Sequence, residues 1–563
     1  MIIIVLLQFS IFIKTVFPIK YVTTRNGPIA GIEYKLFGNT IYEYLGVPFA
    51  KPPIKNLRFK SPEPLDEPTW TEPFIANKPA NACIQGKNKK GYEGMYVNIP
   101  ESEQSEDCLQ LNMWVPKKPS GAVLIFIFGG GFRFGSPSLD IYNGSVIASK
   151  TKSIVVNLNY RLGIFGFSYM CCGIDFQGNM GLLDQQMGMR WVYNNIKQFG
   201  GDPKKITLWG SGAGSASVTA HLFSHDSYKY FKRIIATSGV ITNIWARHYS
   251  TYIDDTLRFL SKKYNCFGNH RHIYNCLSKL NTSQLANESD NFSKYLNVPF
   301  SYGFNIVEKD EVFFKKSLYD KLASRDIKHN VDILLGRTKN EGTYFLPIIN
   351  DHNKFGCKSN NSKLFKYNKN TCQMNKKHLH ELINSLQYTL SINSTGLNYL
   401  KRHYFLNNTK SSRDIASTFL SHIAFDCDII DFAKKCSFYT DGYVFSYVID
   451  VKPSANKWPN WMGSVHGVEL EYAFGLPYRK PKLYKSKLLK IAKKFSNKLM
   501  EMFKNFAKKG NPGFGWSKFD PYNIKYNKID FSIALKRTVK KSKETIKNKC
   551  KIIRDYTSKY VFY

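Results

Sequence analysis

The chain has 563 residues and carries 80 Lys and Arg against 42 Asp and Glu, which gives a formal net charge of +38 at pH 7. Hydrophobic residues make up 43% and aromatic residues 15%, which excludes a disordered chain, and 38 Gly with 23 Pro exclude collagen-like and low-complexity architectures. The sequence is therefore that of a globular protein. No internal repeat or Pro/Ser-rich linker divides it, so we expect one large domain over residues 21–563.

The N-terminus is apolar from Met1 to Ile13, and Lys14 closes this run. The run is shorter than the ~20 residues that a membrane-spanning helix needs, and no later apolar stretch reaches that length. We interpret residues 1–20 as a secretory signal peptide, with a buried N-terminal strand as the alternative. The expected product is secreted to the extracellular space and has no membrane span.

Eleven cysteines fit an oxidising compartment, in which disulfides persist, and the odd number leaves at least one thiol unpaired. Asn-X-Ser/Thr sequons predict a glycoprotein, and the cluster from Asn281 to Asn291 is expected to be an exposed loop. The sequons begin at Asn143, Asn281, Asn287, Asn291, Asn360, Asn393 and Asn407.

Six apolar, β-branched runs predict buried strands of a mostly parallel sheet. A helix with one apolar face is expected between the second and third runs, from Leu182 to Lys197, which completes a βαβ unit. A basic amphipathic helix from Leu488 to Lys508 is expected to end at Gly510 and to turn its lysines to solvent. The six runs are Ala122–Phe128, Ser153–Asn157, Lys205–Trp209, Arg233–Ala236, Val331–Leu335 and Tyr443–Tyr447.

A strand that turns sharply into a small-residue helix is predicted at Ile206–Ser217, through Gly210-Ser-Gly-Ala-Gly214. The α/β-hydrolases place their nucleophile elbow, G-x-S-x-G, in such a turn, and in that register Gly212 occupies the position of the nucleophilic serine. A glycine-rich turn between strand and helix is also typical of a phosphate-binding loop. The turn by itself therefore leaves the chemistry open.

Longer motifs resemble the type B carboxylesterase and cholinesterase family from about Val22 to the final helix. The resemblance implies an α/β-hydrolase fold, in which helices flank a large, mostly parallel central sheet, with no cofactor and no metal. The motifs are Tyr44-Leu-Gly-Val-Pro-Phe-Ala50, Ser105-Glu-Asp-Cys-Leu-Gln-Leu-Asn112, Gly129-Gly-Gly-Phe132, Asn159-Tyr-Arg-Leu-Gly163, Gly178-Asn-Met-Gly-Leu-Leu-Asp-Gln-Gln186, Phe199-Gly-Gly-Asp-Pro203, Asn340-Glu-Gly-Thr-Tyr-Phe-Leu346, Trp461-Met-Gly-Ser-Val-His-Gly467 and Glu471-Tyr-Ala-Phe-Gly-Leu-Pro477.

By this resemblance, the catalytic Glu and His of the family fall on Glu341 and His466. Its oxyanion-hole amides fall on Gly130, Gly131 and Ala213. Arg161 and Asp184 match a buried pair that positions loops without a chemical role.

The resemblance also implies three disulfides, which join Cys83 to Cys108, Cys266 to Cys276 and Cys427 to Cys550. Cys357 and Cys372 are a candidate for a fourth pair. No partner is assigned to Cys171, Cys172 or Cys436.

Three positions depart from the family pattern. Gly212 offers no hydroxyl to form an acyl-enzyme, and loss of such a nucleophile costs roughly 10⁶ in turnover. Phe128 precedes the three glycines where the family often has a polar group, which removes a hydrogen-bonding side chain beside the oxyanion hole. Asn98 stands where cholinesterases carry the tryptophan that holds choline. Without that ring, and with a net charge of +38, choline esters are not expected ligands.

The elbow resembles that of the neuroligin-type members, which are non-catalytic, cholinesterase-like adhesion proteins. The main hypothesis is therefore a secreted, catalytically inactive protein that binds an extracellular or cell-surface protein. The alternative is an active ester hydrolase, either because Ser211 substitutes as nucleophile or because Gly212 reflects a gene-model error.

Two further partners follow from the charge and from the resemblance. The positive charge, densest at Arg479–Lys508 and Lys536–Lys551, predicts salt-sensitive binding to sulfated glycans, although abundant lysine by itself gives the same composition. The resemblance implies a homodimer through the C-terminal helices, to which Leu535–Ile553 would contribute. No nucleic-acid partner is expected.

Overall fold

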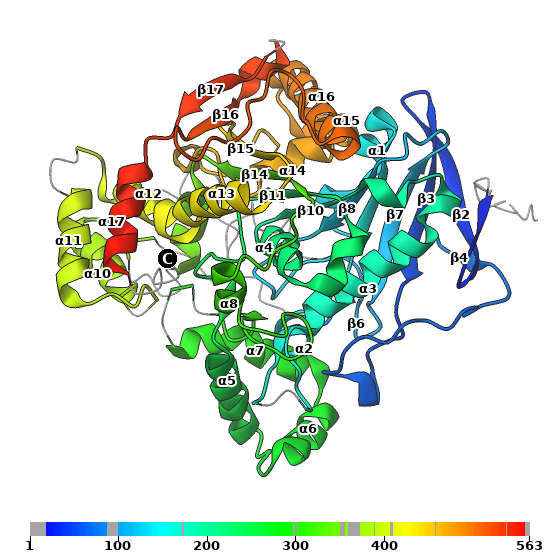
Figure 1. Cartoon of the computed structure of the whole chain (residues 1–563), viewed down its shortest axis with the longest axis horizontal. Helices are drawn as coiled ribbons and strands as arrows, with labels where there is room; N and C mark the ends of the chain where they lie inside the picture. Colours follow the sequence, from blue (N-terminus) through cyan, green and yellow to red (C-terminus); the bar gives the residue numbers. More distant parts are fainter. Residues whose placement is uncertain are drawn as a thin grey trace, which may run out of the picture.

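The computed structural model describes residues 19–86, 100–171, 174–296, 299–300, 302–349, 355–357, 372–387, 389–405, 409–455, 458–535 and 538–557. Within these residues the chain forms a 13-stranded sheet, flanked by helices (Figure 1). Its strands run in the order β1-β2-β3-β7-β9-β8-β10-β11-β14-β15-β16-β17, and β4 pairs with β2. Neighbours from β9 to β16 pair in parallel, whereas the strands at both ends of the sheet pair antiparallel.

The strands of this sheet are β1 (Ile19–Thr24), β2 (Gly27–Leu36), β3 (Asn39–Pro48), β4 (Phe74–Ile75), β7 (Gln110–Pro116), β8 (Val123–Ile127), β9 (Ile154–Leu158), β10 (Ile206–Ser211), β11 (Arg233–Thr237), β14 (Asp332–Thr338), β15 (Val444–Ile449), β16 (Lys525–Ile529) and β17 (Lys540–Lys543). Two small sheets pair β5 (Ala82–Cys83) with β6 (Gln104–Ser105), and β12 (Arg247–His248) with β13 (Ile306–Val307).

The helices are α1 (Ser145–Thr151), α2 (Gly163–Phe167), α3 (Met180–Asn195), α4 (Ala213–Ala220), α5 (Ser250–Lys263), α6 (His270–Lys279), α7 (Thr282–Leu296), α8 (Leu318–Ala323), α9 (Glu341–Ile349), α10 (Lys376–Ser385), α11 (Ser394–Phe405), α12 (Ser412–Ser421), α13 (Cys427–Tyr439), α14 (Val468–Ala473), α15 (Leu476–Arg479), α16 (Ser486–Lys509) and α17 (Lys547–Tyr556). A π-helical turn, His422–Asp426, joins α12 to α13. In the described part of the chain, no helix is both long and apolar enough to cross a membrane.

The fold prediction is confirmed in the middle of the sheet. All six apolar runs are strands of the parallel stretch, the expected helix is α3, and α16 ends at Gly510 with a left-handed φ of 73°. The strands are buried on both faces, since every residue of β8, β9 and β10 is buried. Trp209 of β10 packs on one face, with its ring centre 4.6 Å from that of Phe474 and 5.3 Å from that of Phe503 in α16.

Two local expectations were wrong. The sequon cluster at Asn281–Asn291 is helix α7 and not a loop, because the side chain of Asn281 caps the helix by accepting from the amide of Gln284. Leu535–Ile553 is not one helix, since it contains β17 and only the first part of α17. Ile19 and Lys20, the last two residues of the expected signal peptide, begin β1, and residues 1–18 lie outside the described residues, so the signal peptide stays a prediction.

Among the residues that the structure describes, four disulfides close loops of the chain. Three are the pairs that the resemblance implied, Cys83–Cys108, Cys266–Cys276 and Cys427–Cys550, and the fourth joins Cys357 to Cys372. Cys436 is a buried thiol, Cys171 is exposed, and Cys172 lies outside the described residues, as do the sequon asparagines Asn360 and Asn407. The Arg161–Asp184 pair is also present, buried, with the closest N–O distance at 2.7 Å.

Candidate functional site

The elbow lies where β10 meets α4. Gly212 stands between Ser211, the last residue of the strand, and Ala213, the first of the helix, with φ 58° and ψ −121°. Its amide donates to Thr237 O at 3.0 Å and its carbonyl accepts from Ala216 N at 3.0 Å, so both neighbouring elements hold the turn. A residue with a side chain pays roughly 1–3 kcal/mol for such a positive φ, a cost that glycine avoids.

The elbow directs position 212 at His466. A Cβ built on Gly212 would lie 2.9 Å from His466 Nε2 and 3.5 Å from its Cε1, and apart from the adjacent Ser211 and Ala213 no other described residue has a heavy atom within 4 Å of it. A serine hydroxyl that donates to this nitrogen would place its Cβ about 3.5 Å away, given normal hydrogen-bond geometry. A side chain at position 212 would therefore point at His466, as a nucleophile does. The imidazole, however, occupies part of the space that this side chain would need.

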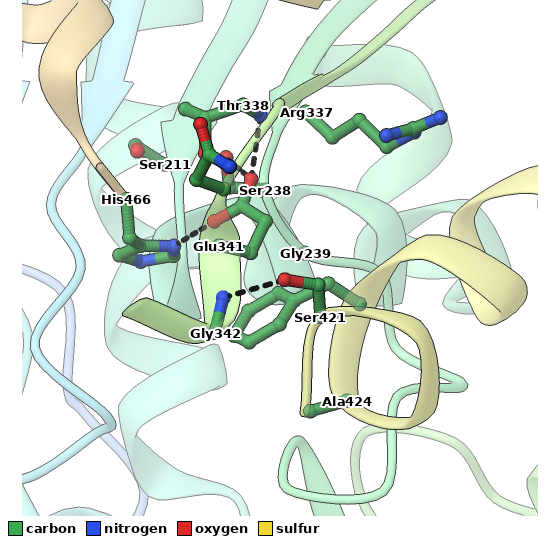
Figure 2. A network of polar contacts seen from close by, with 12 residues as sticks. Ser211, Ser238, Gly239, Arg337, Thr338, Glu341, Gly342, Ser421, Ala424 and His466 are labelled. Carbon is green, nitrogen blue, oxygen red and sulfur yellow. Dashed lines mark hydrogen bonds and ion pairs between the residues drawn. The ribbon is translucent and has the colours of Figure 1, made fainter. Parts of the chain in front are cut away.

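Glu341 and His466 form a bonded pair. Glu341, the first residue of α9, lies behind the imidazole and accepts from His466 Nδ1 at 2.6 Å through its Oε2. Its other oxygen accepts from Ser238 Oγ and from the amide of Thr338, both at 2.6 Å. Figure 2 shows the Glu341 carboxylate between these donors and the ring. Burial by itself raises the pKa of Glu341. The charge and hydrogen bond of His466, with the bonds from Ser238 and Thr338, nevertheless hold it below its ordinary value of 4.5.

Ser211 is turned away from this pair. Its hydroxyl donates to Glu469 Oε1 at 2.7 Å, both residues are buried, and no bond joins Ser211 to His466 in Figure 2. Burial raises the pKa of Glu469, against the lowering effects of the Ser211 bond and of the His466 charge. The hydroxyl is therefore used in the core behind the elbow, and it does not point at the base.

The expected oxyanion amides meet beside the elbow. A Cβ on Gly129 would lie 2.5 Å from Ser211 O and 3.6 Å from Ala213 N, so the glycine loop packs directly against the turn. Gly130, Gly131 and Ala213 all line one cavity with His466. Within the described residues, none of these three amides donates to a protein acceptor.

The cavity in front of the elbow has a volume of about 130 Å³, and eight aromatic side chains contribute to its walls. The π-helical turn brings Phe425 to the imidazole, with ring centres 5.3 Å apart. Asn243 and Trp245 donate to Ala424 O at 2.9 and 2.7 Å, which satisfies a carbonyl that the π turn leaves open. The aromatic side chains of the wall are Phe134, Tyr142, Trp245, Tyr302, Tyr344, Phe345, Phe425 and Trp458.

Phe128 does not stand in this cavity, and the expectation that its ring replaces a polar group beside the oxyanion hole was wrong. The ring is fully buried and stacks on Tyr160, with centres 4.6 Å apart. Phe128 directly follows the last residue of β8, and the backbone there directs its ring into the core. The ring therefore neither narrows the cavity nor contacts His466. Asn98 lies outside the described residues.

Several residues of the site carry no motif and were missed. Ser238 and Thr338 orient Glu341, Glu469 binds Ser211, and Trp245 and Phe425 form walls from segments far apart in the sequence. A Ser-Gly pair at the end of a predicted strand, Ser238-Gly239, was the one usable signal for them. In the described part of the chain, no group of three His, Cys, Asp or Glu side chains is placed to hold a metal ion.

Comparison with known proteins gives one consistent result. A model described as "Carboxylesterase family" matches residues 19–552. Acetylcholinesterase 4 of Caenorhabditis briggsae is 33% identical over 535 residues, which are 89% of this chain and 84% of the relative. Cholinesterase of Mus musculus and acetylcholinesterase of Danio rerio are each 32% identical; they cover 87% and 88% of this chain, and 79% and 81% of their own lengths.

Proposed function

Because the chain belongs to the carboxylesterase family, we propose that it is a secreted, cholinesterase-like protein that binds a partner and hydrolyses no ester at the rates of its enzymatic relatives. The observation that carries this proposal is Gly212 at the elbow, with His466 aimed at it. Glu341, His466 and the three amides keep the places of a hydrolase, but no oxygen is present to attack the carbonyl.

An oxyanion hole alone leaves about 10³ to 10⁴ over the uncatalysed rate, which is far below enzymatic turnover. We therefore assign Glu341 and His466 to the family's triad positions, and Gly130, Gly131 and Ala213 to its oxyanion hole, without assigning them turnover. The neuroligin-type members provide the model for this subtype, in which the fold serves adhesion.

The alternative, an active hydrolase that uses Ser211, is disfavoured by the bond of that hydroxyl to Glu469. Its side chain would have to leave a buried carboxylate and reach His466 from the wrong side of the strand. The second form of the alternative, an error at the codon of residue 212, is tested by sequencing that codon.

The proposal is tested by covalent labelling, because organophosphates mark an activated serine whatever ester it prefers. We expect no labelling of the purified protein and no hydrolysis of a short-chain ester above the spontaneous rate. Stoichiometric labelling at Ser211 or at any other serine of the elbow would show that the protein is an esterase.

We propose an extracellular protein as the main partner and sulfated glycans as an additional ligand. The basic helix α16 supports the second proposal: it carries eight lysines and one glutamate, and Lys487, Lys490 and Lys494 are exposed at helical spacing. Homodimerisation through α16 and α17 is a further proposal, which sedimentation of the purified protein tests. The lysine face of α16 weakens it by charge repulsion.

A further inference from the structure

We propose that the cavity at the elbow binds a small apolar carboxylate, with the carboxylate on the amides of Gly130, Gly131 and Ala213 and the hydrocarbon against the aromatic walls. This inference rests on the proposed loss of hydrolysis, because it treats the cavity as a binding site for an acid and not as a place where an ester is cleaved.

The polar groups of the cavity are suited to an anion. The amides of Gly130 and Gly131 come from the glycine loop, and that of Ala213 from the first residue of α4, so the positive end of the helix dipole adds to the three donors. Gly212 has no side chain to fill the part of the cavity that lies in front of His466 and beside these amides. A carboxylate can therefore approach the donors more closely than an ester does in front of a serine.

A positive side chain lines the same cavity. Arg133 follows the glycine loop, and its guanidinium carbon lies 4.9 Å from the ring centre of Tyr302, another residue of the wall. Charge-assisted hydrogen bonds are roughly twice as strong as neutral ones, so an anion gains more from this wall than a neutral group of the same shape.

The carboxyl groups near the cavity do not oppose an anion. Glu341 lies behind His466 with no exposed surface, and its carboxylate accepts hydrogen bonds from His466, Ser238 and Thr338. Glu471 lines the cavity, but burial raises its pKa to about 7, against the bonds that it accepts from Tyr484, Ala455 and Ser454. It is therefore largely a neutral acid below that pH.

The aromatic residues of the wall determine which hydrocarbon group the proposed acid carries. Trp245, Phe345 and Phe425 face the elbow and offer ring surface, on which an aryl or alkyl group loses water. A cation is disfavoured, because the cavity contains Arg133 and the whole chain carries a net charge of +38. The ligand class is thus an arylalkanoic or short alkanoic acid.

Titration of the full chain with phenylacetate tests the proposal. Binding is measured by calorimetry and by the change in tryptophan fluorescence, to which Trp245 and Trp458 contribute because both line the cavity. Phenylacetamide is the neutral probe of the same shape. We expect phenylacetate to bind and phenylacetamide to bind at least about tenfold more weakly, because only the carboxylate makes charge-assisted bonds. Equal binding of the two probes, or no binding of phenylacetate, would overturn the assignment.

Two arginines that each lie over a tyrosine ring provide a matched pair of variants. Arg133→Met should weaken phenylacetate binding at least tenfold, whereas Arg325→Met, whose guanidinium lies 5.3 Å from the ring centre of Tyr439 and does not line the cavity, should leave it unchanged. Arg133→Lys keeps the charge and should restore part of the affinity. If Arg133→Lys binds as weakly as Arg133→Met while both keep the circular dichroism spectrum of the original protein, the charge is not what holds the anion.

An assay with phenyl acetate separates this inference from the proposed function. Hydrolysis of that ester would overturn the proposed function, whatever the acid does. Absence of both hydrolysis and phenylacetate binding would overturn only the present inference.

Discussion

The surroundings of Gly212 determine what a restored side chain would meet. The elbow holds a positive φ, and the imidazole of His466 lies 2.9 Å from the position of an added Cβ. Any side chain therefore strains the turn and moves the ring, while Glu341 holds that ring by its Nδ1. The recovery of chemistry depends on how far His466 can retreat without losing this bond.

We expect Gly212→Ser to be labelled slowly by an organophosphate, with ester turnover that stays far below that of the enzymatic relatives. Gly212→Ala is the control, since it adds the same Cβ without a hydroxyl, and it should not be labelled. Both variants should lose roughly 1–3 kcal/mol of stability, because both adopt the same strained φ. Equal labelling of the two variants, measured by intact-mass spectrometry, would mean that another residue reacts.

The buried Glu471 makes the stability of the folded protein depend on pH. Burial raises its pKa to about 7 from an ordinary value of 4.5, so the folded protein keeps a proton that the unfolded chain releases between these values. Its contribution to stability is complete below about pH 4.5 and is lost as the pH rises through about 7, for a change of roughly 3 kcal/mol. Asp426, with its pKa raised to about 7 by burial against the charge of Arg337, acts in the same direction.

The variant Glu471→Gln should therefore lose less thermal stability between pH 5 and pH 8 than the original protein does. The exposed Glu63 offers the control Glu63→Gln, which should follow the original curve. Thermal unfolding midpoints at a series of pH values measure both. Parallel curves for Glu471→Gln and the original protein would show that Glu471 titrates normally.

The sequence predicted the positions at the elbow, because each lies in a motif of fixed spacing. It did not predict side-chain directions. Phe128 and Ser211 both lie at the ends of strands, where successive side chains alternate between faces, and a one-residue difference decides whether a group meets the cavity or the core. Glu469, which accepts the hydrogen bond of Ser211, lies 258 residues further along the chain, and no local pattern predicts a contact over that separation.

At the scale of elements, the local sequence predicted the strands that are buried on both faces of the sheet. The central strands are continuous apolar runs, and α16 has a clear apolar face, whereas α3 buries polar residues such as Asp184 and Gln185 beside its apolar ones. The antiparallel strands β1 and β17 at the edges are mostly exposed, and three of the four residues of β17 are lysines, so these strands lack that signal. The interruption of Leu535–Ile553 follows from pairing of β17 with β16, which overrides its helical propensity.

The disulfide between Cys427 and Cys550 is expected to contribute most among the pairs tested by mutation, because it closes 123 residues, whereas Cys266–Cys276 closes 10. By loop entropy alone, removing the first pair costs about 5 kcal/mol and removing the second about 3 kcal/mol. Thermal unfolding of the Cys427→Ala/Cys550→Ala and Cys266→Ala/Cys276→Ala variants compares them. Peptide mapping without reduction should recover all the paired cysteines, and a free thiol at Cys83 or Cys427 would contradict the pairing.

At the scale of the whole molecule, the excess of positive charge is the dominant property. We expect the protein to elute from heparin at higher salt than a neutral protein of similar size, because exposed charges are screened only as ionic strength rises. Lys487→Glu, Lys490→Glu and Lys494→Glu together should lower the eluting salt concentration.

The matched control for the heparin experiment reverses three exposed lysines elsewhere, Lys262, Lys279 and Lys376. It changes the net charge by the same amount away from α16. If both triple variants elute at the same salt concentration, binding follows net charge, and α16 is not a specific glycan site.

The bond between Cys427 and Cys550 also bears on how the protein would respond to extracellular proteases. Lys540, Lys541 and Lys543 are exposed and lie between the two cysteines, so they offer trypsin-like enzymes accessible basic residues. A cut after any of them would leave the last helix covalently attached to α13. The nicked molecule would stay one covalent unit, heavier by one water per cut, and would release the C-terminal piece that carries α17 only when it is reduced.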